Sequence, residues 1–227
     1  MRSQTSFNRI VTPATEAILA GVFIGNDADV QPQFGTVQNF AQDREIFSEG
    51  AGADYFYKLV SGTVRTCRFL ADGRRQIDAF YVAGDIFGLE FGTHYGLSAE
   101  AVTDCMVIMY RKIKLDVGAN HDTHLSRELL AFAVRGMARA QAHALLLGRR
   151  SAMEKMAGFL LDWSNKSPDR DTVSLAMTRQ DIADYLSLTI ETVSRTLSQL
   201  ERDHVIDLPS ARQIRLRKLD MLEDLAA

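Results

Sequence analysis

The pattern of hydrophobic and polar residues divides the chain into segments of different character. From about residue 40, short runs rich in β-branched and aromatic residues alternate with glycine-containing turns. Gly50, Gly62, Gly73 and Gly84 separate these runs at intervals of 12, 11 and 11 residues. Evenly spaced short strands between glycine turns are typical of an antiparallel sandwich or barrel. The segment 40–118 is therefore predicted to be an all-β domain.

Within this domain the clearest strand-like runs are residues 55–60, 63–69 and 76–82. Asp72-Gly73 lies between the second and third runs, and this dipeptide is a strong signal for a β-hairpin. We therefore expect these two runs to pair as antiparallel neighbours.

The segment 1–39 has no sustained hydrophobic period, and we expect a flexible leader with a short helix near residues 15–20. Residues 17–25 come nearest to a secretory signal. Glu16 precedes them and Asn26 follows, which argues against such a signal.

A helical period follows the β-rich segment, so that residues 119–149 are predicted to form one long helix. Apolar or small residues and one histidine recur there at steps of 4, 3, 4, 4, 3 and 4, at Leu125, Leu129, Phe132, Gly136, Ala140, His143 and Leu147. This spacing is close to a heptad seam, and Gly136 and Ala140 would let a partner helix approach closely. The same period also fits a helix packed on its own domain. Residues 147–150 break the period and are expected to form a hinge.

The remaining segment, 150–227, contains a predicted helix over 151–163, a polar loop over 164–171 and two shorter helices. Thr178 and Asp181 form a Thr-x-x-Asp signal for a helix start. A short break at Ser187-Leu188 separates the first short helix from the second.

Thr189 is the expected N-cap of the second short helix, and Glu191 follows in the first turn, where the helix dipole favours a carboxylate. Val193, Leu197 and Leu200 then mark its buried face. Two short helices joined by a tight turn form the geometry that enters the major groove of DNA.

The residues facing away from that buried face are the candidates to contact DNA. We expect base contacts from Ile190, Glu191, Ser194 and Arg195, and backbone contacts from Thr178, Arg179, Gln180, Thr189 and Thr192. Arg195 suits guanine O6 and N7, and Glu191 can accept from cytosine N4. The alternative for this pair is a surface ion pair between residues four apart on a helix.

The chain resembles the CRP/FNR superfamily of bacterial regulators from about Phe40 to Leu222. The resemblance rests on the glycine-punctuated β-rich segment, the long helix, Asp72-Gly73-Arg74, Gly84-Asp85-Ile86-Phe87-Gly88, Thr178-Arg179-Gln180-Asp181-Ile182, Glu191-Thr192-Val193-Ser194-Arg195 and a wing-like segment over 203–217. It implies an α+β architecture: an N-terminal antiparallel β-roll, or jelly-roll-like, domain, a long dimerisation helix and a C-terminal winged helix-turn-helix domain.

Within the superfamily, Glu191-Thr192-Val193-Ser194-Arg195, which follows Leu188-Thr189-Ile190, is similar to the FNR and FixK branch. Members of that branch bind a TTGAT-N4-ATCAA palindrome as dimers and recruit RNA polymerase. The resemblance thus implies a cytoplasmic homodimeric regulator, most often an activator, in microoxic or anaerobic gene control.

Two departures from the family pattern concern its ligands. Cyclic-nucleotide-binding members hold the ribose and phosphate with Gly-Glu-Leu and Arg-Ser-Ala, whereas this chain has Gly88-Leu89-Glu90 and Leu97-Ser98-Ala99. A cyclic phosphate would lack its charge partner, so cyclic AMP is rejected as effector. The leader has no cysteine, and the two cysteines of the chain cannot supply four thiolates to an iron–sulfur cluster.

We therefore expect no cofactor and no metal site. Cys67 and Cys105 fall in strand-like runs and are expected to be core residues, although a redox role stays open. A haem- or metabolite-gated sensor of the same fold is the alternative, with these histidines as possible ligands: His94, His121, His124 and His143. None of the four lies in a ligand-spacing motif.

Composition and charge exclude some classes of function but do not by themselves indicate DNA binding. The net charge is −3, and residues 149–227 hold 12 Lys or Arg against 13 Asp or Glu, a balance of 12 − 13 = −1. DNA binding must therefore rest on the local placement of basic groups. No run of about 18 uncharged apolar residues predicts a membrane span. No combination of nucleophile, base and oxyanion donors predicts an enzyme.

Overall fold

The computed structural model describes residues 35–90, 92–112, 123–149, 151–167 and 169–226, although in α2 the side chains of 123–129 and 132 are not described. The expected leader helix near 15–20 and the segment 17–25 lie outside the described residues.

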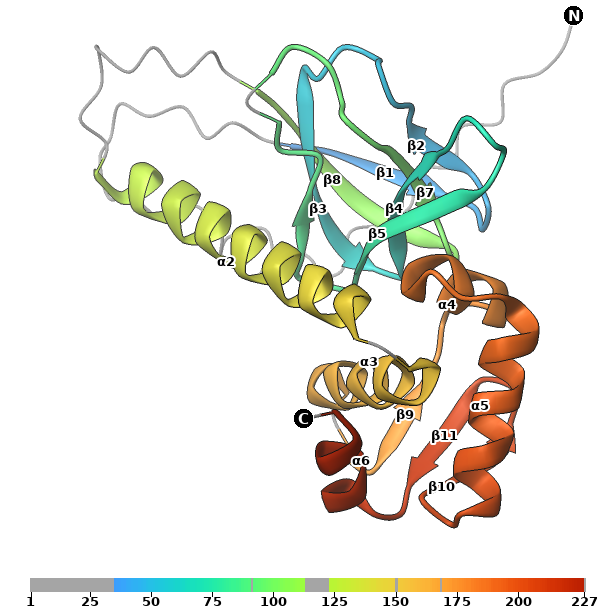
Figure 1. Ribbon diagram of the computed structural model, residues 1–227. Helices are drawn as coiled ribbons and strands as arrows, with labels where there is room; N and C mark the ends of the chain where they lie inside the picture. Colours follow the sequence, from blue (N-terminus) through green and yellow to red (C-terminus); the bar gives the residue numbers. More distant parts are fainter. Residues whose placement is uncertain (1–34, 91, 113–122, 150, 168, 227) are drawn as a thin grey trace, which may run out of the picture.

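The N-terminal part is a β-roll of two antiparallel four-stranded sheets (Figure 1). The first sheet has the order β1 (Thr36–Phe40), β8 (Cys105–Arg111), β3 (Tyr55–Ser61) and β6 (Ile86–Phe87). The second has the order β2 (Glu45–Phe47), β7 (Ser98–Ala101), β4 (Val64–Phe69) and β5 (Arg75–Tyr81). The predicted all-β domain is confirmed, but β1 lies in the segment expected to be a leader, because it pairs with β8 as a sheet edge.

The four regularly spaced glycines all adopt positive φ angles, between 80° and 96°. Such angles are open to glycine and strained for residues with a β-carbon. Gly73 lies in the β4–β5 hairpin, where Leu70 N–H donates to the Arg74 carbonyl at 2.8 Å. The hairpin predicted from Asp72-Gly73 is therefore present.

Two helices follow the β-roll, α2 (Thr123–Gly148) and α3 (Ala152–Lys166). Ser151 caps α3, and its hydroxyl accepts a hydrogen bond from the Glu154 N–H at 3.1 Å. Helix α3 extends three residues beyond the predicted end at Trp163. Strand β9 (Thr172–Ser174) was not predicted; it is short and joins a sheet formed by distant residues.

The C-terminal domain is a winged helix-turn-helix. Helices α4 (Arg179–Leu186) and α5 (Ile190–Arg202) are followed by the wing strands β10 (Ile206–Ser210) and β11 (Gln213–Leu216) and by α6 (Leu219–Ala226). The three strands form one antiparallel sheet in the order β10-β11-β9.

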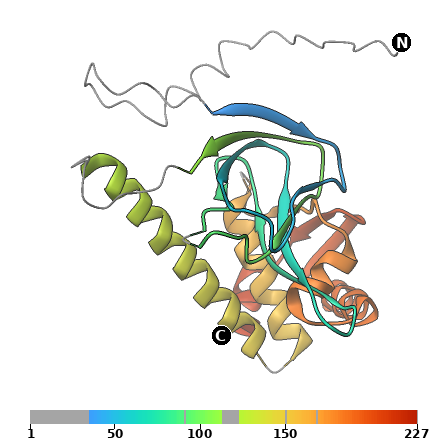
Figure 2. The same cartoon turned by 90° about the horizontal axis from the view of Figure 1, so that it is seen from above.

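The two domains share a continuous hydrophobic core. Cys67, Ile77 and Phe80, on β4 and β5, belong to the same buried cluster as Trp163 of α3 and Ile182 of α4. Figure 2 shows the helices of the C-terminal domain beneath the β-roll, with α2 running along one side. The helix-turn-helix therefore packs directly on the second β-sheet.

Candidate nucleic-acid interface

The first helix of the motif begins with a complete capping box. The Thr178 hydroxyl accepts from the Asp181 N–H at 3.1 Å, and Asp181 Oδ2 accepts from the Thr178 N–H at 3.0 Å. Two N–H groups that the helix itself leaves unpaired are thereby satisfied. The helix start predicted from Thr-x-x-Asp is confirmed.

The turn between α4 and α5 depends on a left-handed residue. Ser187 has φ 52° and ψ 50°, and its N–H donates to the Ala183 carbonyl. Thr189 then caps α5 by accepting from the Thr192 N–H at 3.2 Å. The chain reverses within three residues, which sets α5 across α4 in the arrangement that suits a major groove.

Helix α5 buries one face and exposes its N-terminal turns. Val193, Leu197 and Leu200 are at most 2% exposed. The residues predicted to contact bases lie on the other side: Ile190, Glu191 and Arg195 are exposed, and Ser194 is half-buried.

The residues predicted to contact the DNA backbone lie around the N-termini of the two helices. Thr178, Gln180 and Thr189 are exposed, while Arg179 and Thr192 are half-buried. Arg179 Nη1 donates to Ser194 Oγ at 3.3 Å, a contact that joins the start of α4 to the N-terminal turns of α5. The wing adds exposed cations that sequence reasoning did not assign: Arg212 and Arg215.

Glu191 carries its charge readily at this site. Its own backbone N–H and the Thr189 hydroxyl hydrogen-bond the carboxylate and hold the pKa of Glu191 below its usual range, with a smaller contribution from the charge of Arg195. Across the described ranges, Glu191 and Arg195 form no ion pair, so the surface-pair alternative is not what this structure contains. Both side chains are exposed, and a ligand can reach them.

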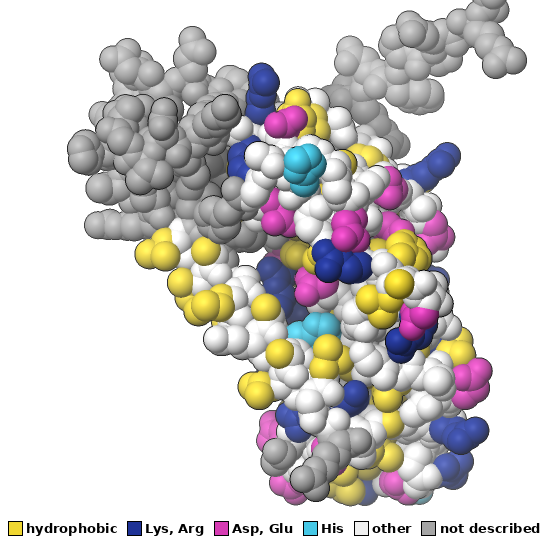
Figure 3. Space-filling model, turned by 45° about the horizontal axis from the view of Figure 1, so that its top comes forward, with side chains coloured by type: hydrophobic (Ala, Val, Ile, Leu, Met, Phe, Trp, Pro, Cys, Tyr) yellow, Lys and Arg dark blue, Asp and Glu magenta, His cyan; other side chains and the backbone are white. Residues whose placement is uncertain are grey.

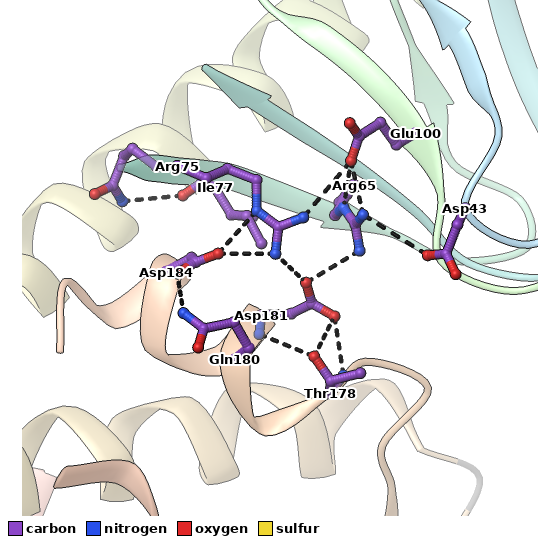
Figure 4. A network of polar contacts seen from close by, with 10 residues as sticks. Asp43, Arg65, Arg75, Ile77, Glu100, Thr178, Gln180, Asp181 and Asp184 are labelled. Atoms are coloured by element: carbon purple, nitrogen blue, oxygen red, sulfur yellow. Dashed lines mark hydrogen bonds and ion pairs between the residues drawn. The ribbon is translucent and has the colours of Figure 1, made fainter. Parts of the chain in front are cut away.

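A polar network ties α4 to the β-roll, and sequence reasoning missed it (Figure 4). Asp181 Oδ1 accepts from Arg65 Nη1 at 3.0 Å and also from Arg75 Nη2. Arg75 Nε donates to Asp184 Oδ2, and Arg65 Nε donates to Glu100 Oε2. Burial alone would lower the pKa of Arg75, but its contacts with the two aspartates raise it above the usual value. No local signal announces the pairs between the β-roll arginines and α4, because their partners lie more than 100 residues apart.

Helix α2 has a free apolar side, visible as hydrophobic side chains along the helix in Figure 3. Leu130, Val134, Met137 and Leu145 are 51% to 75% exposed and recur at steps of 4, 3 and 8. With 100° of rotation per residue, these positions cluster on one side.

The predicted dimer seam follows a different side of α2. His143 is buried in its own chain, where its ring stacks on Tyr185 at 4.1 Å between centroids; it is thus not available as a seam residue, and this assignment is corrected. Gly136 and Ala140 line a cavity against the β-roll, and Leu147 is half-buried. The side chains of the other three predicted seam residues lie outside the described set: Leu125, Leu129 and Phe132.

A cavity of about 190 Å³ lies between the β-roll and α2. Leu89 and Leu97, at the positions where the resemblance to the superfamily expects ligand-binding residues, both line it. Its charged side chains are Arg139, Asp78 and Glu90, so carboxylates outnumber cations two to one. Arg139 lies over the Tyr81 ring, 4.7 Å from its centroid.

Among the residues that the structure describes, the cysteines and histidines show no arrangement typical of a metal or redox site. Cys67 and Cys105 are buried, and burial raises the pKa of each thiol to about 11. His94 contacts the Thr93 hydroxyl at 2.9 Å, whereas the structure does not describe the side chains of His121 and His124. Among the described residues, no group of three or more metal-ligating side chains comes together, and no helix is long and apolar enough to cross a membrane.

Comparison with known proteins covers both domains. Residues 37–116 match the cyclic nucleotide-binding domain, and residues 154–225 match the Crp-like helix-turn-helix domain. The nitrogen fixation regulation protein FixK of Azorhizobium caulinodans is 45% identical over 87% of this chain and 82% of that protein. FixK of Rhizobium meliloti is 41% identical over 83% of this chain and 86% of that protein.

The solved structure of FixK2 from Bradyrhizobium japonicum has the same two-domain architecture. It aligns with a TM-score of 0.80 and 42% identity, over 85% of this chain and 98% of that one. These relatives extend over most of both chains, so the similarity includes the order of the domains as well as their individual folds.

Proposed function

Because this chain belongs to the CRP/FNR superfamily of transcription regulators, in its FixK-like branch, we propose that it binds a specific DNA sequence as a homodimer and has no enzymatic activity. The observation that carries this proposal is the exposed first turns of α5, where Glu191 and Arg195 present an acceptor and a forked donor beside each other. Such groups discriminate base edges in the major groove.

The proposed target is a TTGAT-N4-ATCAA palindrome, with one helix-turn-helix on each half-site. Ile190, Glu191, Ser194 and Arg195 read the bases, while the start of α4 and the cap of α5 grip the phosphates through Thr178, Arg179, Gln180, Thr189 and Thr192. The Arg179–Ser194 hydrogen bond supports this division, because it sets a phosphate-gripping cation beside the reading face. Arg212 and Arg215 of the wing are proposed as further phosphate contacts.

The proposed dimer forms along the exposed apolar side of α2. Large apolar side chains that lie free on a helix are typical of an interaction surface, and a second α2 has the length and period to cover them. Leu130, Val134, Met137 and Leu145 replace His143 as the proposed central contacts.

We propose that the protein acts without a cyclic nucleotide. The cavity of the β-roll has an excess of carboxylates, which repels a phosphate, and leucines line it where the family's cyclic-nucleotide binders have a glutamate and an arginine. A metabolite-gated regulator is the second candidate, since the cavity is present. Haem fits it poorly, because pockets for ligands of drug size start at about 300 Å³.

The physiological role is inferred from the relatives. Two FixK proteins regulate nitrogen fixation by their names, and the transcriptional activatory protein AadR of Rhodopseudomonas palustris is 45% identical over 71% of this chain. We accordingly propose a cytoplasmic regulator, mainly an activator that recruits RNA polymerase, in microoxic or anaerobic gene control.

A gel shift tests the central proposal. The purified protein should retard a duplex with TTGAT-N4-ATCAA and lose most of this affinity when both half-sites are scrambled, with the same result with or without cyclic AMP. Equal retardation of the two duplexes at physiological salt would contradict sequence-specific binding.

A further inference from the structure

Helix α4 meets the β-roll through buried apolar residues and also through charges, of which Arg65 and Asp181 are almost fully buried. We propose that Arg65 and Arg75 are positioning residues for DNA binding. By holding two aspartates of α4, they fix the angle of the helix-turn-helix against the β-roll, and thereby the spacing of the two recognition helices in the dimer. This inference rests on the proposed function, because it requires a dimer that binds DNA.

Because its charges are buried, this contact favours one orientation of α4 against the β-roll. The side chain of Arg65 is 9% exposed and that of Asp181 is 3% exposed. Charges buried this deeply are tolerated only when they are paired and hydrogen-bonded. If α4 tilted or slid, Arg65 and Asp181 would lose their hydrogen bonds to each other while still shielded from water. The network therefore disfavours intermediate orientations of α4.

The fork of Arg75 adds direction to the contact. Its Nη2 binds Asp181 Oδ1 while its Nε binds Asp184 Oδ2 at 2.8 Å. The two carboxylates lie three residues apart, on successive turns of α4. A planar guanidinium that holds both of them fixes the rotation of the helix as well as its distance from the sheet.

The same two carboxylates orient the turn proposed to grip DNA. The other oxygen of Asp181 closes the capping box on Thr178. The other oxygen of Asp184 accepts from Gln180 Nε2 at 2.7 Å. Each aspartate thus joins a β-roll arginine on one side to a proposed phosphate contact on the other (Figure 4).

Two further contacts connect this arrangement to the dimer helix. His143 Nε2 of α2 donates to the Tyr185 carbonyl of α4 at 2.9 Å, and Arg139 of α2 lies over Tyr81 of β5. Helices α2 and α4 are therefore both anchored to β5 and to each other. In a dimer built along α2, the position of each α4 then determines where its recognition helix lies relative to that of the partner.

The experiment compares full and half palindromes for the full-length Arg75→Gln variant. Arg75 is separated from the reading face, so its loss removes no proposed DNA contact. The variant should lose roughly tenfold in affinity for the intact palindrome, because a loosened second domain must be ordered before it binds. Affinity for a duplex with one scrambled half-site should change less than about threefold, since one domain can still orient freely on it.

Asp184→Asn tests the same contact from the other domain, and the double variant should lose no more than either single variant. Arg74→Gln, at the neighbouring position, is the matched control, because it breaks only an exposed pair with Asp72. Val107→Ala, in the core of the other sheet, controls for lost stability: it should lower the unfolding temperature and leave the ratio of full-site to half-site affinity unchanged.

Three results would overturn the proposal: unchanged affinity in Arg75→Gln, increased affinity, or an equal fall on both duplexes. Failure of the wild type to prefer the palindrome would instead contradict the proposed target. The variants would then be compared on a duplex that the wild type selects from a random pool.

Discussion

At Gly62 the chain has no room for a β-carbon. A β-carbon there would lie 2.4 Å from the Asp104 carbonyl oxygen, and φ is 90°. Gly62→Ala should therefore lower the free energy of unfolding by about 2 to 4 kcal/mol, since backbone strain and a clash with backbone add. Chemical denaturation measures this loss.

Gly73→Ala is the control for that prediction. Gly73 has a similar φ of 83°, but nothing lies within 4 Å of a β-carbon there. Its substitution should cost only the conformational strain, about 1 kcal/mol. Equal losses in the two variants would show that the Asp104 contact does not constrain the turn.

The two thiols should be inert in the folded protein. Because burial raises the pKa of Cys67 and Cys105 to about 11, the reactive thiolate is a small fraction of each below that pH. Reaction with a disulfide reagent should be slow at pH 8 and rise about tenfold per pH unit towards pH 11. Urea-unfolded protein is the control, and fast labelling of the native chain would speak for a redox role.

At the scale of single helices, the loss of an arginine from α4 and from α5 should change DNA binding in different ways. Arg195→Ala should weaken binding by roughly 1 to 3 kcal/mol per half-site and relax the preference at the guanine it reads. Arg179→Ala should weaken all duplexes similarly and lower the salt slope by about one unit per contact. Binding selections and salt titrations separate the two.

Arg202→Ala serves as the control, because Arg202 lies at the far end of α5. It should leave both the base preference and the affinity near those of the wild type. A parental preference at every position in the Arg195 variant would mean that α5 is not the reading helix.

The helix-turn-helix could be predicted from the sequence because its signals are local. Thr178 and Asp181 together cap α4, Thr189 caps α5, and both caps lie within three residues of the groups they bind. The proposed dimer side of α2 could not be predicted in the same way. Apolar residues follow two sides of that helix, and only the position of the β-roll decides which side remains free.

At the scale of the whole molecule, sequence reasoning cannot reach the contacts between domains. Arg65 and Asp181 are 116 residues apart, and each also belongs to an ordinary local pattern, a strand and a capping box. Their pairing follows from how the second sheet packs on α4. The same holds for His143. Its spacing along α2 predicted a position in the dimer seam and did not indicate the stacking on the Tyr185 ring.

The exposed side of α2 should hold the protein together as a dimer. Met137→Asp would place an unpaired charge among the apolar side chains of both copies, at a cost of several kcal/mol. Sedimentation should then show monomers, together with weaker binding to the palindrome. Met221→Asp makes the same change at an exposed methionine of α6 and should remain dimeric. A dimer that survives Met137→Asp would show that subunits meet elsewhere.

The free side of α2 also affects how the cell can set the output of this regulator. Wherever monomers prevail, doubling the amount of chain raises the number of dimers about fourfold, because two copies must meet to cover that side. Small changes in the transcription rate of its own gene, or in the rate of its proteolysis, would then change the number of dimers strongly. Promoter occupancy would rise more steeply than the amount of protein, and no small-molecule effector would be needed.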